Sequence, residues 1–114
     1  MANRPITILG CNTTDGTLTL SDHGSTNVDP GDTVTWLIGQ NSGVQTVNSV
    51  SDYPNSTDVF NPDPAKMGGG NNANWQGTVN PNIARGSQET YYIQWMADNG
   101  GGSFTYDPKI QVNP

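Results

Sequence analysis

The chain has few of the residues that several functional classes require. It contains 4 basic residues against 10 acidic ones, and its formal net charge is -6. The basic residues Arg4, Lys66, Arg85 and Lys109 are scattered, so they form no patch that could neutralise phosphates. The sequence therefore argues against nucleic acid and against an anionic membrane as partners.

Cysteine and histidine occur once each, as Cys11 and His23. A single cysteine cannot form an internal disulfide, and Cys11 ends the apolar run 6–11, where a buried and unreactive thiol is expected. His23 lies beside a turn, and the sequence places no nucleophile with it. We interpret His23 as a solvated loop residue rather than a general base.

Long hydrophobic runs are absent from the sequence as given. No stretch approaches the 18 or more apolar residues of a membrane span. The first ten residues lack the apolar core and the small-residue cleavage site of a signal peptide. The sequence as written therefore predicts a cytoplasmic protein, and a secreted domain whose leader has been removed is the alternative.

The composition that remains favours a turn-rich all-β domain. The 114 residues include 14 glycines and 8 prolines, but also three tryptophans and four tyrosines. Disordered chains are poor in aromatic residues, and this length is sufficient for one domain with its own core. We therefore expect a single folded domain over residues 1–114.

One stretch, residues 28–38, is expected to organise the fold. It reads V-D-P-G-D-T-V-T-W-L-I, in which D-P-G-D is turn chemistry and the following residues alternate. Val34, Trp36 and Ile38 share one face of the predicted strand. Because Trp36 would bury a large area there, this segment is predicted to be the central strand of an antiparallel sandwich.

Short strands separated by turns are predicted along the rest of the chain. The alternation of apolar residues places them at 6–11, 17–21, 28, 33–38, 44–50, 77–79, 88–96 and 103–112. A long irregular loop is expected at about 51–76, where asparagine, proline and glycine are abundant. Seven or eight strands at this spacing predict a two-sheet Greek-key β-sandwich.

Four segments carry a resemblance to a known family. Residues 30–36 resemble the G-D-x-V-x-[FW] strand of the cupredoxins, the small blue-copper proteins, and residues 86–95 are similar to their G-E-T-Y-x-V-x-F strand. Residues 102–106 resemble the family's G-x-Y-x-Y run, and residues 109–112 resemble its closing G-K-I-x-V. The resemblance implies a cupredoxin-like sandwich and the same order of strands.

The copper ligands of that family are missing. Gln45 occupies the expected position of the first histidine ligand, and Asp107 that of the cysteine. Blue-copper chemistry needs a thiolate and two imidazoles, so type-1 copper is excluded and no cofactor is expected. The resemblance implies that Gln45 and Asp107 lie near each other at an emptied copper pole. There a direct or water-bridged hydrogen bond would replace the metal.

Two polar groups remain as candidate binding residues. Asp52, Asn55, Asp58, Asn61 and Asp63 offer oxygen ligands of the kind that calcium takes, but without regular spacing, so solvation of the loop is the favoured interpretation.

Trp75 lies among amides, including Asn72 and Asn74. An exposed tryptophan in such surroundings is typical of sugar-binding surfaces, and the alternative is a loop anchor that plugs the sandwich.

The sequence predicts a protein that is not an enzyme. Glu89 is the single glutamate and belongs to a predicted strand, so no placed carboxylate pair is expected. Our first hypothesis is a copper-free, cupredoxin-like structural or protein-interaction module that can self-associate. The alternative is a small lectin-like carbohydrate-binding protein, with or without calcium.

Overall fold

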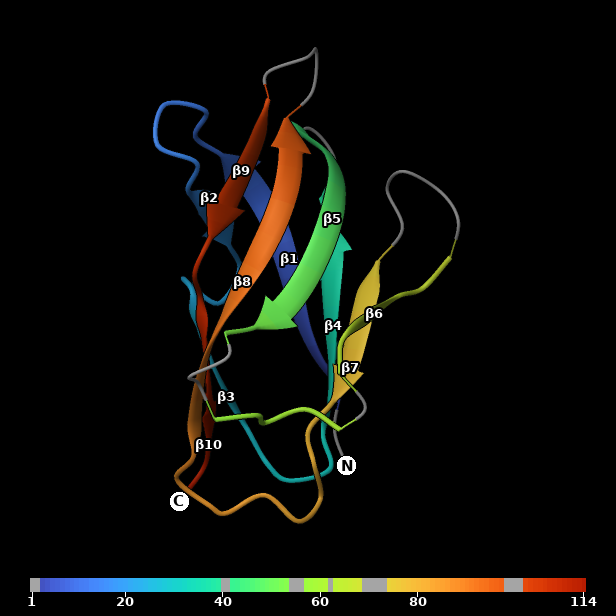
Figure 1. Ribbon diagram of the computed structural model, residues 1–114, viewed down its shortest axis with the longest axis vertical. Helices are drawn as coiled ribbons and strands as arrows, with labels where there is room; N and C mark the ends of the chain where they lie inside the picture. The colour runs from blue at the N-terminus through green and yellow to red at the C-terminus, as the bar shows by residue number, and fades with distance from the viewer. Residues whose placement is uncertain (1–2, 40–41, 54–56, 62, 69–73, 98–101) are drawn as a thin grey trace.

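Two mixed β-sheets pack face to face in the computed structural model (Figure 1). The structure describes residues 3–39, 42–53, 57–61, 63–68, 74–97 and 102–114. Within these ranges the strands are β1 Asn3–Cys11, β2 Leu18–Leu20, β3 Ser25–Val28, β4 Thr33–Ile38, β5 Val44–Asp52, β6 Ala65–Lys66, β7 Trp75–Thr78, β8 Gln88–Ala97, β9 Ser103–Tyr106 and β10 Lys109–Val112. Within the same ranges, no helix has the length and hydropathy needed to cross a membrane.

The first sheet has the order β2-β1-β4-β7-β6, so β4 occupies its centre, as the sequence predicts. The expectation of an antiparallel sandwich was wrong, because each sheet contains one parallel pair of strands. β4 pairs in parallel with β1, from Asn3 opposite Thr33 to Ile8 opposite Ile38, and antiparallel with β7. The turn before β4 is closed by the N–H of Asp32, which donates to the carbonyl of Asp29 at 3.1 Å. Gly31 has φ 87° there, a conformation that glycine adopts without strain.

The second sheet has the order β3-β10-β8-β5, and β9 also pairs with β8. The single closing strand expected over 103–112 is in fact two strands. The break falls at Asp107 and Pro108, because proline has no N–H to donate to a ladder. β10 pairs in parallel with β3 and antiparallel with the start of β8, while β9 pairs with the second half of β8.

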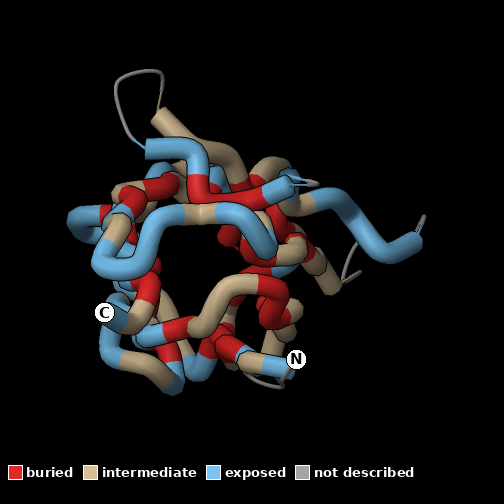
Figure 2. Tube along the Cα trace, turned by 90° about the horizontal axis from the view of Figure 1, so that it is seen from below, coloured by how far each residue is buried: buried red, intermediate tan, exposed pale blue. Residues whose placement is uncertain are grey.

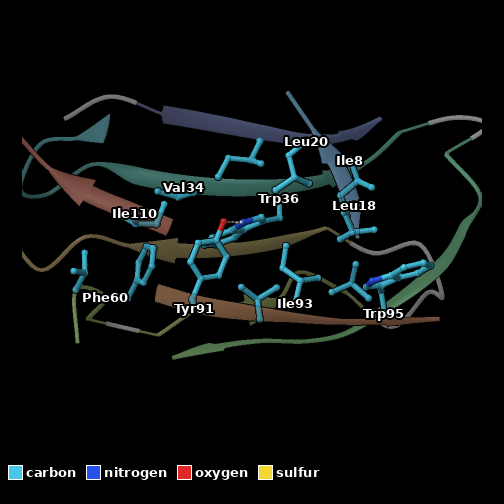
Figure 3. Close-up of a cluster of buried hydrophobic side chains, with 14 of the residues drawn as sticks. Ile8, Leu18, Leu20, Val34, Trp36, Phe60, Tyr91, Ile93, Trp95 and Ile110 are labelled. Carbon is cyan, nitrogen blue, oxygen red and sulfur yellow. Dashed lines mark hydrogen bonds between the residues drawn. The ribbon is translucent and has the colours of Figure 1, made fainter. Parts of the chain in front are cut away.

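The core fills the space between the sheets, and it confirms the predicted burial of Trp36 and Trp95, which are 1% and 0% exposed. Trp36 on β4 donates its indole N–H to the hydroxyl of Tyr91 on β8 at 3.0 Å, which ties one sheet to the other (Figure 3). The Trp36 ring also meets the rings of Tyr91 and Phe60 edge-on, with centroids 5.5 and 5.6 Å apart. Figure 2 shows the buried stretches, in red, on both sides of this space.

Two predictions about β5 and the following loop were wrong. Strict alternation along β5 fails because its pairing with β8 shifts register twice, and the buried residues are Val44, Val47 and Val50. The irregular loop expected at about 51–76 also has the wrong bounds, since β5 runs through Asp52, β7 begins at Trp75, and β6 lies between them.

Candidate functional site

The predicted contact between Gln45 and Asp107 is not formed. Gln45 lies near the start of β5, at the level of Met96 and Ala97 on β8. Asp107 follows Tyr106, which pairs with Ile93, so it lies four residue levels lower, about 13 Å along the strand. β9 runs back along β8 and therefore carries Asp107 away from Gln45. The contact expected at an emptied copper pole was wrong for this reason.

Asp107 instead lies beside Tyr53, just beyond the end of β5. The Tyr53 hydroxyl donates a hydrogen bond to Oδ1 of Asp107. This hydrogen bond, together with partial burial and the negative charge of Asp107, raises the pKa of Tyr53 to about 12. The Tyr53 ring also contacts that of Tyr92, with centroids 5.0 Å apart.

Trp75 connects the two sheets at their edges. Its indole N–H donates to the carbonyl of Val47 on β5 at 3.2 Å, and its half-buried ring packs against the core. Asn74, also half-buried, accepts a backbone hydrogen bond from Met67 at 2.8 Å. Asn72 lies outside the described residues. These contacts favour the anchor interpretation of Trp75 over the sugar platform.

The sequence predicts that Glu89 is a structural strand residue, and the structure places it on the buried face of β8. It is 0% exposed and shares the inward face of β8 with Tyr91, Ile93 and Trp95. Its Oε1 accepts the backbone N–H of Val59 at 2.8 Å, whereas Oε2 has no hydrogen-bond partner among the described residues. The alternation of apolar residues along β8 could have indicated this place, because it puts the ionisable Glu89 on the same face as the core residues of the strand.

Two aspartates lie beside Glu89 at this end of the sandwich. Asp52 is paired with Tyr91 across β5 and β8, and directly opposed residues share a face, so Asp52 is on the inward side. Asp58 precedes Val59 in the segment 57–61, which crosses the lower end of the sandwich in Figure 1. The ligand oxygens of Asp52, Asp58 and Glu89 all lie within 4.8 Å of one another. We call these three residues the acidic end.

The backbone fixes the position of Asp58. The carbonyl of Val59 accepts the N–H of Asn80, and the N–H of Asn61 donates to the carbonyl of Thr78, both at 2.8 Å. The side chain of Val59 is fully buried, and Phe60 forms an isolated bridge with Val79. Asp58 therefore projects from a well-anchored segment, although it is itself exposed.

The carboxylates of the acidic end are not neutralised by a positively charged side chain among the described residues. Burial raises the pKa of Glu89 to about 7; the N–H of Val59 opposes the shift, and the charges of Asp52, Asp58 and Asp63 add to it. Partial burial, followed by the charges of Asp58 and Asp52, raises the pKa of Asp63. Within the described ranges, the ion pairs all involve Asp29 or Asp32, so no basic side chain neutralises the acidic end there.

The structure thus brings together part of the oxygen-rich cluster that the sequence suggested. Asp52 and Asp58 lie together, and their charges act on Asp63. Asn61 is exposed, and Asn55 lies outside the described residues. The residue that sequence reasoning left out of the cluster, Glu89, is the one at its buried side.

A second feature is the outer surface of β5, β8 and β9. No Asp, Glu, Lys or Arg occurs in residues 44–51, 90–97 or 103–106. The pairing of the three strands places a set of uncharged side chains on this surface, which we call the uncharged face: Thr46, Ser49, Ser51, Tyr92, Gln94, Met96, Ser103 and Thr105. A shallow hollow of about 220 Å³ lies on it, lined by Asn48, Gln94, Ser103, Phe104 and Thr105.

Comparison with known proteins places the chain by its fold. No protein-family model and no curated protein matches it. Among solved structures it is similar to the inclusion body protein PixA from Burkholderia cenocepacia J2315, with a TM-score of 0.54, 15% identity, and coverage of 98% of this chain and 96% of that one. A cysteine protease inhibitor from Entamoeba histolytica aligns with a TM-score of 0.47 and 11% identity, over 99% of this chain and 97% of that one. The likeness to PixA extends to the all-β fold and no further.

Proposed function

We propose that the protein is a non-enzymatic interaction module that associates with a second copy of itself through the uncharged face. The observation that carries the proposal is the distribution of charge. A chain with a net charge of -6 repels its copies over most of its surface. On the uncharged face, the described residues of three adjacent strands present no ionised side chain. Two copies can therefore meet there without placing like charges against each other.

The chemistry of the uncharged face supports this role. Interface cores are depleted in charged residues and enriched in tyrosine and methionine, and this face presents Tyr92 and Met96, the latter 37% exposed. Its other groups are amides and hydroxyls, which donate and accept hydrogen bonds equally well. Such groups suit a two-fold contact, in which the same patch meets itself.

A copper-free, cupredoxin-like Greek-key arrangement is part of the proposal, and it is supported by strand order alone. The consecutive strands β2 and β3 lie in different sheets, and each sheet contains one parallel pair, β1 with β4 and β3 with β10. The motif match at residues 102–106 lends no support, because Asp107 does not lie beside Gln45.

The geometry of the carboxylates supports a non-enzymatic role. Paired glycosidase carboxyl groups are separated by about 5–5.5 Å or about 6.5–9.5 Å, with the substrate between them. The oxygens of the acidic end lie within 4.8 Å of one another, and one of the three side chains is fully buried. Because Glu89 is fully buried, it is not placed to protonate or attack a glycosidic bond of a bound sugar.

Sedimentation equilibrium with charged variants tests the proposal. Gln94 is exposed at the middle of the uncharged face. Gln94→Lys alone and Gln94→Glu alone should each weaken self-association about tenfold or more, because like charges meet across a two-fold contact. A mixture of the two variants should associate again. Thr19→Lys, at the exposed position of β2 in the other sheet, is the control and should associate as the wild type does. A wild-type protein that stays monomeric at millimolar concentration would refute the proposal.

Carbohydrate binding is the second candidate, and the hollow on the uncharged face favours it. Its amide and hydroxyl lining suits sugar hydroxyls, and its volume of about 220 Å³ is below the roughly 300–1,000 Å³ of drug-sized sites. A glycan array, run with and without calcium, should then show binding that Gln94→Ala removes and Trp75→Phe leaves intact. Silence across the array would eliminate this candidate.

A further inference from the structure

The acidic end has features that neither self-association nor sugar binding requires. Glu89 belongs to the buried face of β8, yet one of its carboxylate oxygens meets no hydrogen-bond donor among the described residues. Native proteins satisfy buried polar atoms with a protein group, a water or an ion. A carboxylate oxygen of Glu89 lies within 4.8 Å of oxygens of two further carboxylates, so the group that satisfies the unpartnered oxygen is expected to carry positive charge.

We propose that Asp52, Asp58 and Glu89 bind one hard divalent cation, with Ca²⁺ as the preferred ion. The inference is independent of the proposed self-association. It assigns each residue a carboxylate oxygen as ligand, with Oε2 of Glu89 as the innermost one. Asp63 is exposed and interacts electrostatically with Asp58 and Asp52, so it adds negative charge beside the three proposed ligands.

The spacing of the oxygens fits calcium. Ca²⁺ holds its oxygen ligands at about 2.3–2.6 Å, so two ligands of one ion lie up to about 5 Å apart. The three oxygens lie within 4.8 Å of one another and can therefore contact a common ion without rearrangement of the backbone. Zn²⁺ favours nitrogen and sulfur ligands, and Mg²⁺ demands a smaller octahedral shell. Both are expected to bind more weakly than Ca²⁺.

The three ligands come from separate parts of the fold. Asp52 is the last residue of β5, Asp58 belongs to the crossing segment 57–61, and Glu89 is the second residue of β8. A shared ion therefore joins three parts of the chain at the lower end of the sandwich. Since the ion binds the folded state and not the dispersed carboxylates of the unfolded chain, it should stabilise the fold.

Calorimetric titration of the chelator-treated, full-length protein with CaCl₂ tests the inference. We expect one ion per chain with a Kd below about 1 mM, and a rise in Tm of about 5 °C or more at saturation. Asp58→Asn should weaken binding about tenfold or more, since affinity follows the charge of the ligands. The side chain of Asp58 is exposed, so this variant is expected to fold.

A matched control removes one negative charge elsewhere. Asp15 accepts hydrogen bonds from Thr17 in an exposed turn, and an asparagine can accept them equally well. The turn is at the other end of the molecule, because the carbonyl of its Gly16 accepts the indole N–H of Trp95, near the end of β8. Asp15→Asn should bind Ca²⁺ as the wild type does. Equal losses in Asp15→Asn and Asp58→Asn would show diffuse attraction to an acidic surface and would overturn the site.

Terbium luminescence provides a readout that does not depend on stability. Tb³⁺ takes the place of Ca²⁺ at oxygen sites, and its emission is sensitised by a nearby aromatic ring. Tyr91 lies opposite Asp52 in the ladder, and Tyr53 follows Asp52 in the chain. Saturable, calcium-competed emission that Asp52→Asn abolishes would support the site. Absence of both sensitised emission and calcium-dependent heat in the folded wild type would overturn it.

Discussion

The backbone N–H of Val59 donates a hydrogen bond of 2.8 Å to Oε1 of Glu89, thirty residues further along the chain. This contact links the crossing segment 57–61 to the start of β8. It also orients the carboxylate, because one oxygen is engaged and the other is left without a partner among the described residues. The proposed cation site follows from this single contact and from the two aspartates beside it.

A pH-dependent stability is the first prediction. Because the pKa of Glu89 is raised from 4.5 to about 7 in the folded state, folding favours its neutral form. The contribution of Glu89 to the free energy of unfolding is fully present below pH 4.5 and is lost as the pH rises through 7. Without divalent cations, the free energy of unfolding should lose about 3 kcal/mol from this group between those values.

Urea unfolding in chelator at a series of pH values measures this effect. Other carboxylates titrate in the same range, so the comparison is with Glu89→Gln, which cannot ionise. The decline in stability from pH 4.5 to 8 should be smaller in the variant by about 3 kcal/mol, whatever the absolute stability of either protein. Parallel curves for the two proteins would contradict the buried, unneutralised state of Glu89.

The hydrogen bond between the sheets gives the second prediction. Tyr91→Phe removes the acceptor of the Trp36 indole N–H and leaves a buried donor unpaired, which should cost about 1–3 kcal/mol. Tyr92→Phe removes the same hydroxyl from the outer side of the same strand and should change stability by less than about 0.5 kcal/mol. Thermal unfolding of the two variants measures the difference. Equal losses would argue against the Trp36–Tyr91 bond.

The third prediction concerns Tyr53. Its raised pKa of about 12 is caused first by the hydrogen bond to Asp107, so Asp107→Asn should shift that pKa down toward the ordinary value of 10. NMR of the tyrosine ring carbons measures each phenol separately, and Tyr53→Phe assigns the signal. If the pKa of Tyr53 is the same in Asp107→Asn as in the wild type, the contact at the end of β5 is not formed.

Much of the fold could be predicted from local patterns. The turn at residues 29–32 and the alternation that follows it defined β4 to the residue, and the apolar alternation of β8 placed Tyr91, Ile93 and Trp95 in the core. These signals are local and are repeated over several residues. β5 escaped the same reasoning because its two bulges depend on the partner strand, and they convert its alternation into a spacing of three.

The candidate site was harder to predict because it depends on long-range contacts. The aspartates at 52 and 58 were visible as a cluster in the sequence, but Glu89 joins them only when β8 pairs with β5 and Val59 crosses beneath. The copper-pole expectation failed for the same reason, since the direction in which β9 returns along β8 decides where Asp107 lies. Trp75 is likewise explained by its contact with Val47 on a strand of the other sheet.

The most direct test of the cation site is a crystal structure with anomalous scattering data, from crystals grown with Ca²⁺ or Tb³⁺. The account predicts one anomalous peak at about 2.3–2.6 Å from carboxylate oxygens of Asp52, Asp58 and Glu89, with Oε2 of Glu89 among the ligands. Crystals of Asp58→Asn should lose the peak or show it greatly weakened. Well-ordered wild-type density at the acidic end without such a peak, and with Oε2 bonded to a neutral donor, would contradict the account.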